Sequence, residues 1–424
     1  MIRDYLHVIG HSHFRNLLLG QIVSQVSLNM LSFVLAIRIY QETKSNTAVS
    51  LMLLSFGIPA ILFGVLAGGV VDYFDKRRVM QFCNLSRVGI IILFFFLHKS
   101  LLVVYLLSVL VSVVTQLFIP AEAPSIPTLV KRNNLLSANS LFTISFYLAT
   151  ITGFILAGPA IKLMGPKNVY LFIAGLMGTA FLFVSRLPAM EATRKNEKFA
   201  YNLPFFFSVI RDGIRFIQSN LRVGQSLVLL TIAQALVATL SVLAPGFADR
   251  ILRIDLSDAS FVVMGPAALG LIIGALWVGA VGKQFLKRKL IILGIIATSV
   301  TLLLLSILSM IQVVPRWGIS GPGFYWGGVG VAMGLLLLLG FSNSFITVPT
   351  STVLQQESES QMRGRVYGVL TSLTGGVSVL PVVFSGVLAD SVGIDKTLFV
   401  IGTIILVIGI AHMKDIYPSH MKRL

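Results

Sequence analysis

The stretch "GGVVDYFDKRRV" at residues 68–79 decides the fold, because it gathers charges at the end of a long apolar sequence. No charged residue occurs from Ala48 to Val71, and five then follow within seven positions: Asp72, Asp75, Lys76, Arg77 and Arg78. An uncharged stretch of about 20 residues crosses the roughly 30 Å hydrocarbon core of a bilayer as a helix. The charged cluster therefore marks a connection between two membrane-spanning helices.

The composition extends this interpretation to the whole chain. Of the 424 residues, 56% are hydrophobic and 12% are charged, and the mean hydropathy is +0.90, whereas soluble proteins have about 25% charged residues. Continuous apolar stretches exclude a barrel of alternating strands and predict an all-α membrane protein with twelve transmembrane helices. The stretches are 16–38, 47–71, 79–97, 100–120, 138–161, 168–187, 223–246, 260–282, 290–312, 325–348, 366–389 and 396–413.

The 33 Lys and Arg residues are divided unevenly between the two sides of these spans. With both termini in the cytoplasm, 23 of them lie in cytoplasmic segments and 8 in external ones. This bias is typical of multi-pass membrane proteins and predicts a plasma (inner) membrane location with both termini cytoplasmic. The net charge of +17 then follows from topology and from contact with lipid headgroups, so no nucleic-acid partner is expected.

The chain also carries an internal repeat. A shift of 211 residues places Gly68, Asp72, Arg77 and Arg78 on Gly279, Lys283, Arg288 and Lys289, and three of the four positions keep their character. The repeat predicts two parallel six-helix bundles, residues 1–187 and 223–424. The polar segment 188–222 is the predicted cytoplasmic linker. Gly270 and Gly274, four residues apart in span 8, predict a close approach of two helices.

The pattern Gly68-x3-Asp72-x4-Arg77-Arg78 resembles the signature loop of the major facilitator superfamily, whose architecture is two parallel six-helix repeats. Four further stretches resemble its drug:proton antiporter branch, which includes macrolide efflux pumps and the enterobactin exporter. They are "GQIVSQVS" in span 1, "PAEAPSIPTLV" and "LLSANSL" around the connection between spans 4 and 5, and "RGRVYGVL" at the start of span 11.

This resemblance implies a secondary active transporter that exports drug-like or amphipathic small molecules by alternating access, with protons as the coupling ion. A siderophore or a lysophospholipid is the alternative cargo, because related branches carry these compounds on similar frames. The resemblance implies no cofactor and no metal, and we expect a monomer whose other partners are membrane lipids.

In this superfamily the substrate cavity lies between the halves and is lined by spans 1, 4, 7 and 10, so polar side chains in these spans are the candidates. The stripe in span 1 has spacings that place its members on one helical face. The alternative is that these side chains form hydrogen bonds between helices. The candidates are Gln21, Gln25, Asn29, Gln116, Gln234 and Asn343.

Charged residues inside the membrane are rare and often functional. Arg38, near the outer end of span 1, either reaches the interface or balances the charge of an anionic substrate. Arg87 lies about 15 Å beyond the 76–78 cluster if span 3 is helical, so we expect it to face protein or water. No carboxylate lies in the middle of a span. Glu122 and Asp72, at span ends, are the remaining candidates for a proton carrier.

The resemblance also assigns a role to the charged loop, as a latch between the two halves. Asp72 would dock against the positive N-terminus of span 11 and against Arg363 or Arg365, and so favour the outward-facing state. One of the basic residues at 76–78 would pair with Glu122, and Lys283 would repel the corresponding helix end in the second half. The alternative is a solvated charge cluster that only sets the topology.

Other classes of function fit less well. Gly318-Ile319-Ser320-Gly321 matches the short nucleophile pattern of intramembrane rhomboid proteases. However, Ser320 is predicted to be external and His412 cytoplasmic, so the pair cannot meet within the distance that catalysis needs. The sequence contains neither a His-Glu-x2-His motif nor a Cys/His zinc cluster. We therefore expect no enzyme, and a membrane receptor or scaffold is the remaining alternative to a transporter.

Overall fold

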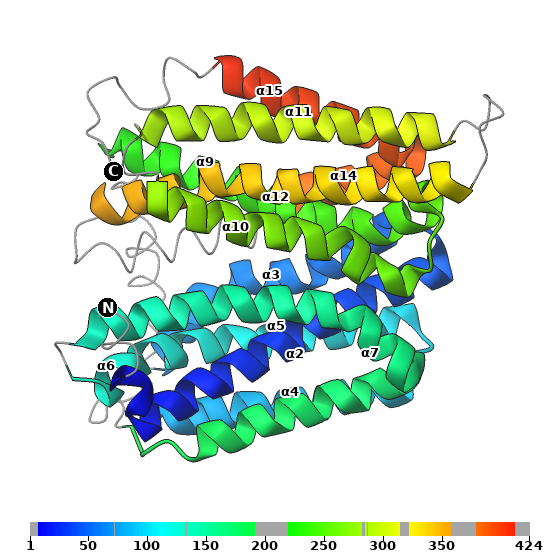
Figure 1. Cartoon of the computed structure of the whole chain (residues 1–424). Helices are drawn as coiled ribbons and strands as arrows, with labels where there is room; N and C mark the ends of the chain where they lie inside the picture. Colours follow the sequence, from blue (N-terminus) through cyan, green and yellow to red (C-terminus); the bar gives the residue numbers. More distant parts are fainter. Residues whose placement is uncertain are drawn as a thin grey trace. The chain divides into compact units, whose positions relative to one another are not determined.

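The computed structural model describes residues 7–71, 73–131, 134–190, 219–281, 285, 287–313, 322–357 and 379–411. The described residues form helices joined by short connections (Figure 1). In the first part of the chain these are α2 (Ser12–Thr43), α3 (Asn46–Val71), α4 (Lys76–Leu97), α5 (Leu101–Glu122), a 3-10 turn (Ala123–Ser125), α6 (Ile126–Leu129) and α7 (Leu135–Ser185).

The described residues of the second part contain six α-helices. They are α9 (Leu221–Gly246), α10 (Gly265–Val281), α11 (Lys287–Val313), α12 (Pro322–Glu357), α14 (Val379–Val392) and α15 (Ile394–Ala411). Between α9 and α10 lie two π-helical segments, Phe247–Leu252 and Ser260–Met264, and a 3-10 turn at Leu256–Asp258.

Each of the twelve predicted spans overlaps one of these helices. The predicted spans 138–161 and 168–187 lie in α7, whose backbone leaves the helical conformation at Gly165 with φ 81° and ψ 162°. Positive φ favours glycine, and Pro166 starts the next helical segment without needing a backbone donor. Among the described residues, nine helical stretches are long and apolar enough to cross a membrane. The fold is therefore an all-helical membrane architecture, as predicted.

Contacts divide the chain into two units, and the division cuts through two helices. The first unit contains α2 up to Leu35, α3 from Leu54 onward, and α4, α5 and α7. The second contains residues 36–53 together with α9 to α15. The predicted linker 188–222 falls mostly outside the described residues. The predicted bundle limits at 187 and 223 stay predictions.

Each unit has its own tightly packed interior. In the first, a core cluster joins Phe14 and Leu17 of α2, Met80 of α4 and Phe118 of α5, all buried. Large apolar side chains elsewhere are exposed, among them Leu102 at 68%. Many large apolar side chains are exposed in this way on the described helices. Such a surface is unusual for a soluble protein and matches one that contacts lipid.

Candidate functional site

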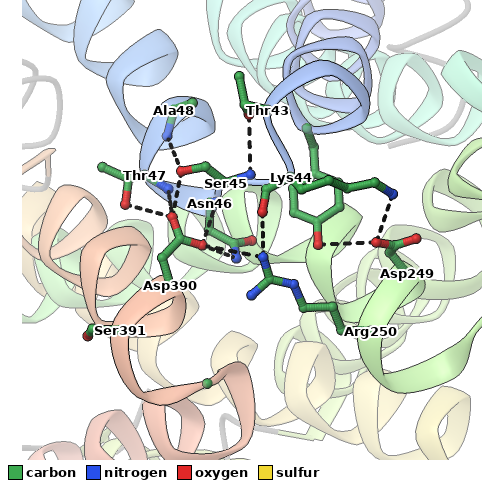
Figure 2. A network of polar contacts seen from close by, with 12 residues as sticks. Thr43, Lys44, Ser45, Asn46, Thr47, Ala48, Asp249, Arg250, Asp390 and Ser391 are labelled. Carbon is green, nitrogen blue, oxygen red and sulfur yellow. Dashed lines mark hydrogen bonds and ion pairs between the residues drawn. The ribbon is translucent and has the colours of Figure 1, made fainter.

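A polar network surrounds the turn between α2 and α3, within the second unit (Figure 2). At its centre is the carboxylate of Asp390, near the end of α14. It accepts hydrogen bonds from the Ser45 hydroxyl at 2.6 Å, from the Asn46 backbone N–H and amide at 2.9 and 3.0 Å, and from the Thr47 backbone N–H and hydroxyl, both at 2.8 Å. Both carboxylate oxygens are used.

The position of these donors explains the arrangement. α3 begins at Asn46, and the first N–H groups of a helix have no partner inside the helix. They also carry a partial positive charge. The first turn of α3 contains no acidic residue, so Asp390 supplies the negative charge and the acceptors from a helix more than 340 residues later in the chain.

Two residues of the π-helical segment after α9 hold the other side of the turn (Figure 2). Arg250 donates a hydrogen bond to the Lys44 carbonyl and lies 3.9 Å from the Asp390 carboxylate. Asp249 forms an ion pair with Lys44 at 2.9 Å and accepts a hydrogen bond from the Tyr40 hydroxyl at 3.4 Å. Positive and negative groups therefore alternate around the turn.

Glycines on both neighbouring helices allow the turn to pack closely. A Cβ atom at Gly386 of α14 would lie 2.8 Å from both the Asn46 carbonyl and the Ser50 hydroxyl. A Cβ atom at Gly246 would lie 2.4 Å from the Asn46 side-chain oxygen. Asn46 and Ser50 are both fully buried. The turn is thus complementary to α14 and to the end of α9 in shape as well as in charge.

A second polar cluster lies inside the first unit, around Arg87. This side chain is fully buried, and its Nη1 donates to the Ser24 hydroxyl at 3.3 Å and to the Asn84 side chain at 3.1 Å. Its guanidinium lies over the Phe118 ring, 4.5 Å from the ring centre. Glu122, at the end of α5, is also buried and interacts electrostatically with Arg87.

The Arg87 cluster is incompletely satisfied. Among the described residues, neither Nε nor Nη2 of Arg87 has a hydrogen-bond acceptor, and Oε1 of Glu122 has no donor. The expectation that a basic residue at 76–78 pairs with Glu122 is replaced by a different arrangement. Arg77 donates to the Ser185 carbonyl at 2.8 Å, and Arg87 is the positive charge that Glu122 interacts with.

The predicted cavity residues differ in their surroundings. Gln25 and Asn29 are half-buried, and the Asn29 amide donates to the Gln25 carbonyl at 2.8 Å. Gln21 is buried and donates to the Phe142 carbonyl of α7 at 3.4 Å, which is a hydrogen bond between helices. The other three candidates lie on other helices. Gln116 is buried, and its amide donates to the Ser112 carbonyl at 3.4 Å. Asn343 is buried in α12, whereas Gln234 is exposed in α9.

Half of the predicted latch residues, Asp72, Arg363 and Arg365, lie outside the described residues, as does Lys283 of the second loop. Gly68 lies within α3, and Arg77 and Arg78 lie in the first turn of α4. Gly279 lies in α10, and Arg288 and Lys289 lie in the first turn of α11. Their proposed action as a latch stays a prediction.

Arg38 has a partner on its own helix. It forms an ion pair with Glu42, one turn later on α2. The side chains are 17% and 34% exposed, so part of the Arg38 charge is balanced locally. A role as counter-charge for an anionic substrate would require that this pair opens.

Asp75 has a structural role that the sequence did not indicate. Its carboxylate caps α4 and accepts hydrogen bonds from the backbone N–H groups of Arg77 at 2.8 Å and Arg78 at 3.4 Å. It also accepts from the Met190 backbone N–H at 3.3 Å, after the end of α7. The same side chain therefore caps the start of one helix and binds the segment that follows another.

We expect Asp75→Ala to lower the free energy of unfolding by about 1 kcal/mol, the usual loss for a helix cap. The midpoint of thermal unfolding in detergent measures this change. Asp75→Asn, which can still cap, is the matched control and should lose less. Equal losses in both variants would contradict the capping role.

A family model described as Major Facilitator Superfamily matches residues 17–382. The chain belongs to the Major Facilitator Superfamily. The resemblance of the 68–78 stretch to the signature loop is thus confirmed at the level of the family.

Relatives in this superfamily match nearly the whole chain. The uncharacterized MFS-type transporter YfiS of Bacillus subtilis (strain 168) is 25% identical over 403 residues, which are 93% of this chain and 91% of that protein. The enterobactin exporter EntS of Shigella boydii serotype 18 is 25% identical over 415 residues, covering 94% of this chain and 92% of that protein.

Solved structures of the superfamily share the fold. A bacterial homologue of the human lysosomal transporter Spinster superimposes with TM-score 0.74 and 12% identity, covering 97% of this chain and 96% of that one. The nucleoside transporter NupG gives TM-score 0.72 at 12% identity, covering 94% and 98%. The family match over most of the chain makes the protein a multi-pass membrane transporter of the superfamily, with a small molecule as its substrate.

Proposed function

We propose that this transporter exports amphipathic, drug-like small molecules across the plasma (inner) membrane by alternating access, with protons as the coupling ion. The observation that supports export in this proposal is the similarity to an exporter, EntS, along 94% of this chain. The monomeric state, the cytoplasmic termini and the contact with lipids are part of the same proposal.

The polar residues of α2 support this class of cargo. Gln25 and Asn29 offer neutral donors and acceptors, half-buried on one helix face. Sites for small molecules are mostly apolar, with a few polar groups that orient the ligand. Neutral amides fit an amphipathic molecule better than a strongly charged one, because they form hydrogen bonds without fixing a counter-charge.

A siderophore is the second candidate cargo. It is favoured by one specific observation, because an exporter that matches this chain carries enterobactin.

Purified protein in proteoliposomes tests both candidates, with a panel of drug-like compounds and iron-free enterobactin, each assayed with and without an imposed pH gradient. Movement of drug-like compounds alone supports the first candidate, and movement of enterobactin alone supports the second. Transport that ignores the gradient would remove proton coupling from the proposal.

We expect Gln25→Leu to reduce the transport rate per molecule by about tenfold, the factor for one lost hydrogen bond of about 1.4 kcal/mol. The folded yield should stay unchanged, because the Asn29 amide keeps its 2.8 Å bond to the Gln25 backbone carbonyl and loses only the 3.5 Å bond to the Gln25 side-chain oxygen. Transport in proteoliposomes and gel filtration measure the two quantities.

Gln21→Leu, one turn earlier on the same face, is the matched control. Because Gln21 is buried and bonds the Phe142 carbonyl, this variant should lose thermal stability and keep its rate per folded molecule. A Gln25→Leu protein that loses yield but transports normally would show that Gln25 only joins helices.

A further inference from the structure

We propose that Glu122 binds the coupling proton inside the first unit, and that Arg87 is the charged partner that favours its release. This role depends on the proton coupling proposed above. The sequence leaves two candidates for the proton carrier, Glu122 and Asp72, and Asp72 lies outside the described residues. The surroundings of Glu122 favour it on four grounds: its burial, its open hydrogen-bonding position, the free donors of its partner and a connection to α2.

Burial sets Glu122 apart from the other acidic residues. It is the one buried carboxyl group among the described residues, with 7% of its surface exposed. It is the last residue of α5, at the end of that helix which is predicted to be cytoplasmic. An ionised carboxylate is costly inside a membrane protein and is by default a functional candidate. Binding a proton removes most of that cost, because the carboxyl group is then neutral.

The hydrogen bonds of Glu122 leave room for a proton. Its Oε1 has no donor, and no direct ion pair joins it to Arg87 within the described part of the chain. Asp390 has the opposite arrangement, because five donors at 2.6 to 3.0 Å converge on its carboxylate and favour the ionised form. Of these two acids, Glu122 is therefore the one that can exchange a proton.

Arg87 has the free donors that an ionised Glu122 needs. Its Nη1 donates to the Ser24 and Asn84 side chains at 3.3 and 3.1 Å, but its Nε and Nη2 have no acceptor among the described residues. Its positive charge interacts with Glu122, and a nearby opposite charge favours the ionised carboxylate. Burial therefore favours the bound proton, whereas Arg87 favours its loss. A carboxyl group between two such influences can bind and release a proton in one cycle.

The other side chains around the pair are uncharged. The Phe118 ring, one turn before Glu122 on α5, lies 4.5 Å from the Arg87 guanidinium and stabilises it when Glu122 is neutral. α2 contributes the Ser24 hydroxyl, and α4 contributes the Cys83 thiol, which also interacts with Arg87. Within the described residues, Arg87 is the charged group that acts on Glu122.

The pair is connected to the proposed cargo site through α2. The Ser24 hydroxyl, which accepts a hydrogen bond from Arg87, directly precedes Gln25, the residue proposed above to contact the cargo. A proton on Glu122 weakens its attraction for Arg87, and Arg87 transmits this change to α2 through Ser24. All four residues belong to the first unit. Proton and cargo can thus influence each other's binding within one unit, as coupling requires.

Infrared difference spectroscopy tests whether Glu122 exchanges a proton. Spectra of the protein in nanodiscs, compared between acidic and alkaline buffer, should contain the C=O stretching band of a buried carboxyl group, and Glu122→Gln should lack it. The matched control is Asp395→Asn in the second unit, which should keep the band. If Glu122→Gln does not fold, Glu122→Asp replaces it and should move the band. A band that is absent from the unsubstituted protein, or unchanged in the folded Glu122 variant, would overturn the proposal.

Arg87→Lys tests the partner in the same experiment. This variant keeps the positive charge but loses the planar fork of N–H donors. If Arg87 acts on the proton, the pH at which the band changes should move. A purely structural Arg87 would alter the thermal stability and leave that pH in place, which would overturn its role as the partner.

Transport then connects the proton to the cargo. In proteoliposomes with whichever compound of the panel above is moved, Glu122→Gln should lose the stimulation of transport by a pH gradient and keep part of the exchange of cargo without a gradient. Normal stimulation in this variant, or an equal loss of both activities, would overturn the proposal. If the unsubstituted protein itself ignores the gradient, the proton coupling proposed above is overturned, whichever result the infrared spectra give for Glu122.

Discussion

Replacing Arg87 by leucine should lower the free energy of unfolding by about 3–5 kcal/mol, the range for removing one partner of a buried charge pair. The guanidinium is fully buried and interacts electrostatically with the buried Glu122 side chain, without a direct ion pair between these two described residues. Its loss also leaves the Ser24 and Asn84 side chains without the donor they share. The midpoint of thermal unfolding of the purified protein measures the effect.

The double variant Arg87→Leu/Glu122→Leu is the control for this interpretation. Replacing both partners of a buried pair by apolar residues is often neutral or stabilising, because no uncompensated charge remains. We therefore expect the double variant to recover most of the stability that Arg87→Leu loses. A double variant as unstable as the single one would show that Arg87 acts through packing on Phe118 and not through its charge.

Gly270→Ala should prevent most of the protein from folding, or lower its stability by about 3 kcal/mol, the upper end for overpacking a core. A Cβ atom at this position would lie 1.8 Å from the Leu337 carbonyl oxygen of α12. Gly340 of α12 has the reciprocal relation, 1.8 Å from the Ala267 carbonyl oxygen of α10. The two backbones touch, so no side-chain rotation can relieve the clash.

Gly279→Ala, on the same helix, is the matched control for Gly270→Ala. Nothing lies within 4 Å of a Cβ atom at Gly279, so this variant should fold as well as the unsubstituted protein or slightly better, because alanine has the higher helix propensity. The yield of monodisperse protein after gel filtration and the midpoint of thermal unfolding measure the difference between the two variants. Equal yields for Gly270→Ala and Gly279→Ala would contradict the close packing of α10 on α12.

The sequence predicted the helices well because lipid imposes a strict rule on them. A spanning segment must be apolar and about 20 residues long, and this rule placed α3 and α5 within two residues at each end. The close approach at Gly270 and Gly274 was predicted for the same kind of reason, since only small residues let helix backbones touch. The distance of Arg87 from the interface predicted that it faces protein or water, and the structure buries it in protein.

Contacts between distant parts of the chain were not predicted. A single aspartate at the end of a span looks like an ordinary interfacial charge, and nothing near Asp390 in the sequence indicates that its partners are residues 45–47. Asp75 was similarly missed, because an acidic residue before "KRR" is most simply explained as part of a solvated charge cluster. The capping geometry, and not the composition, defines its role.

The long separation between Asp390 and its turn also has a consequence for the order of synthesis. Residues 45–47 leave the ribosome more than 340 residues before their acceptor exists. Until then, the first N–H groups of α3 must be satisfied by water. We therefore expect the first helical hairpin to insert early. The N–H groups at the start of α3 should become protected from water only after α14 has been made. Protection of this turn would therefore indicate that synthesis has passed α14.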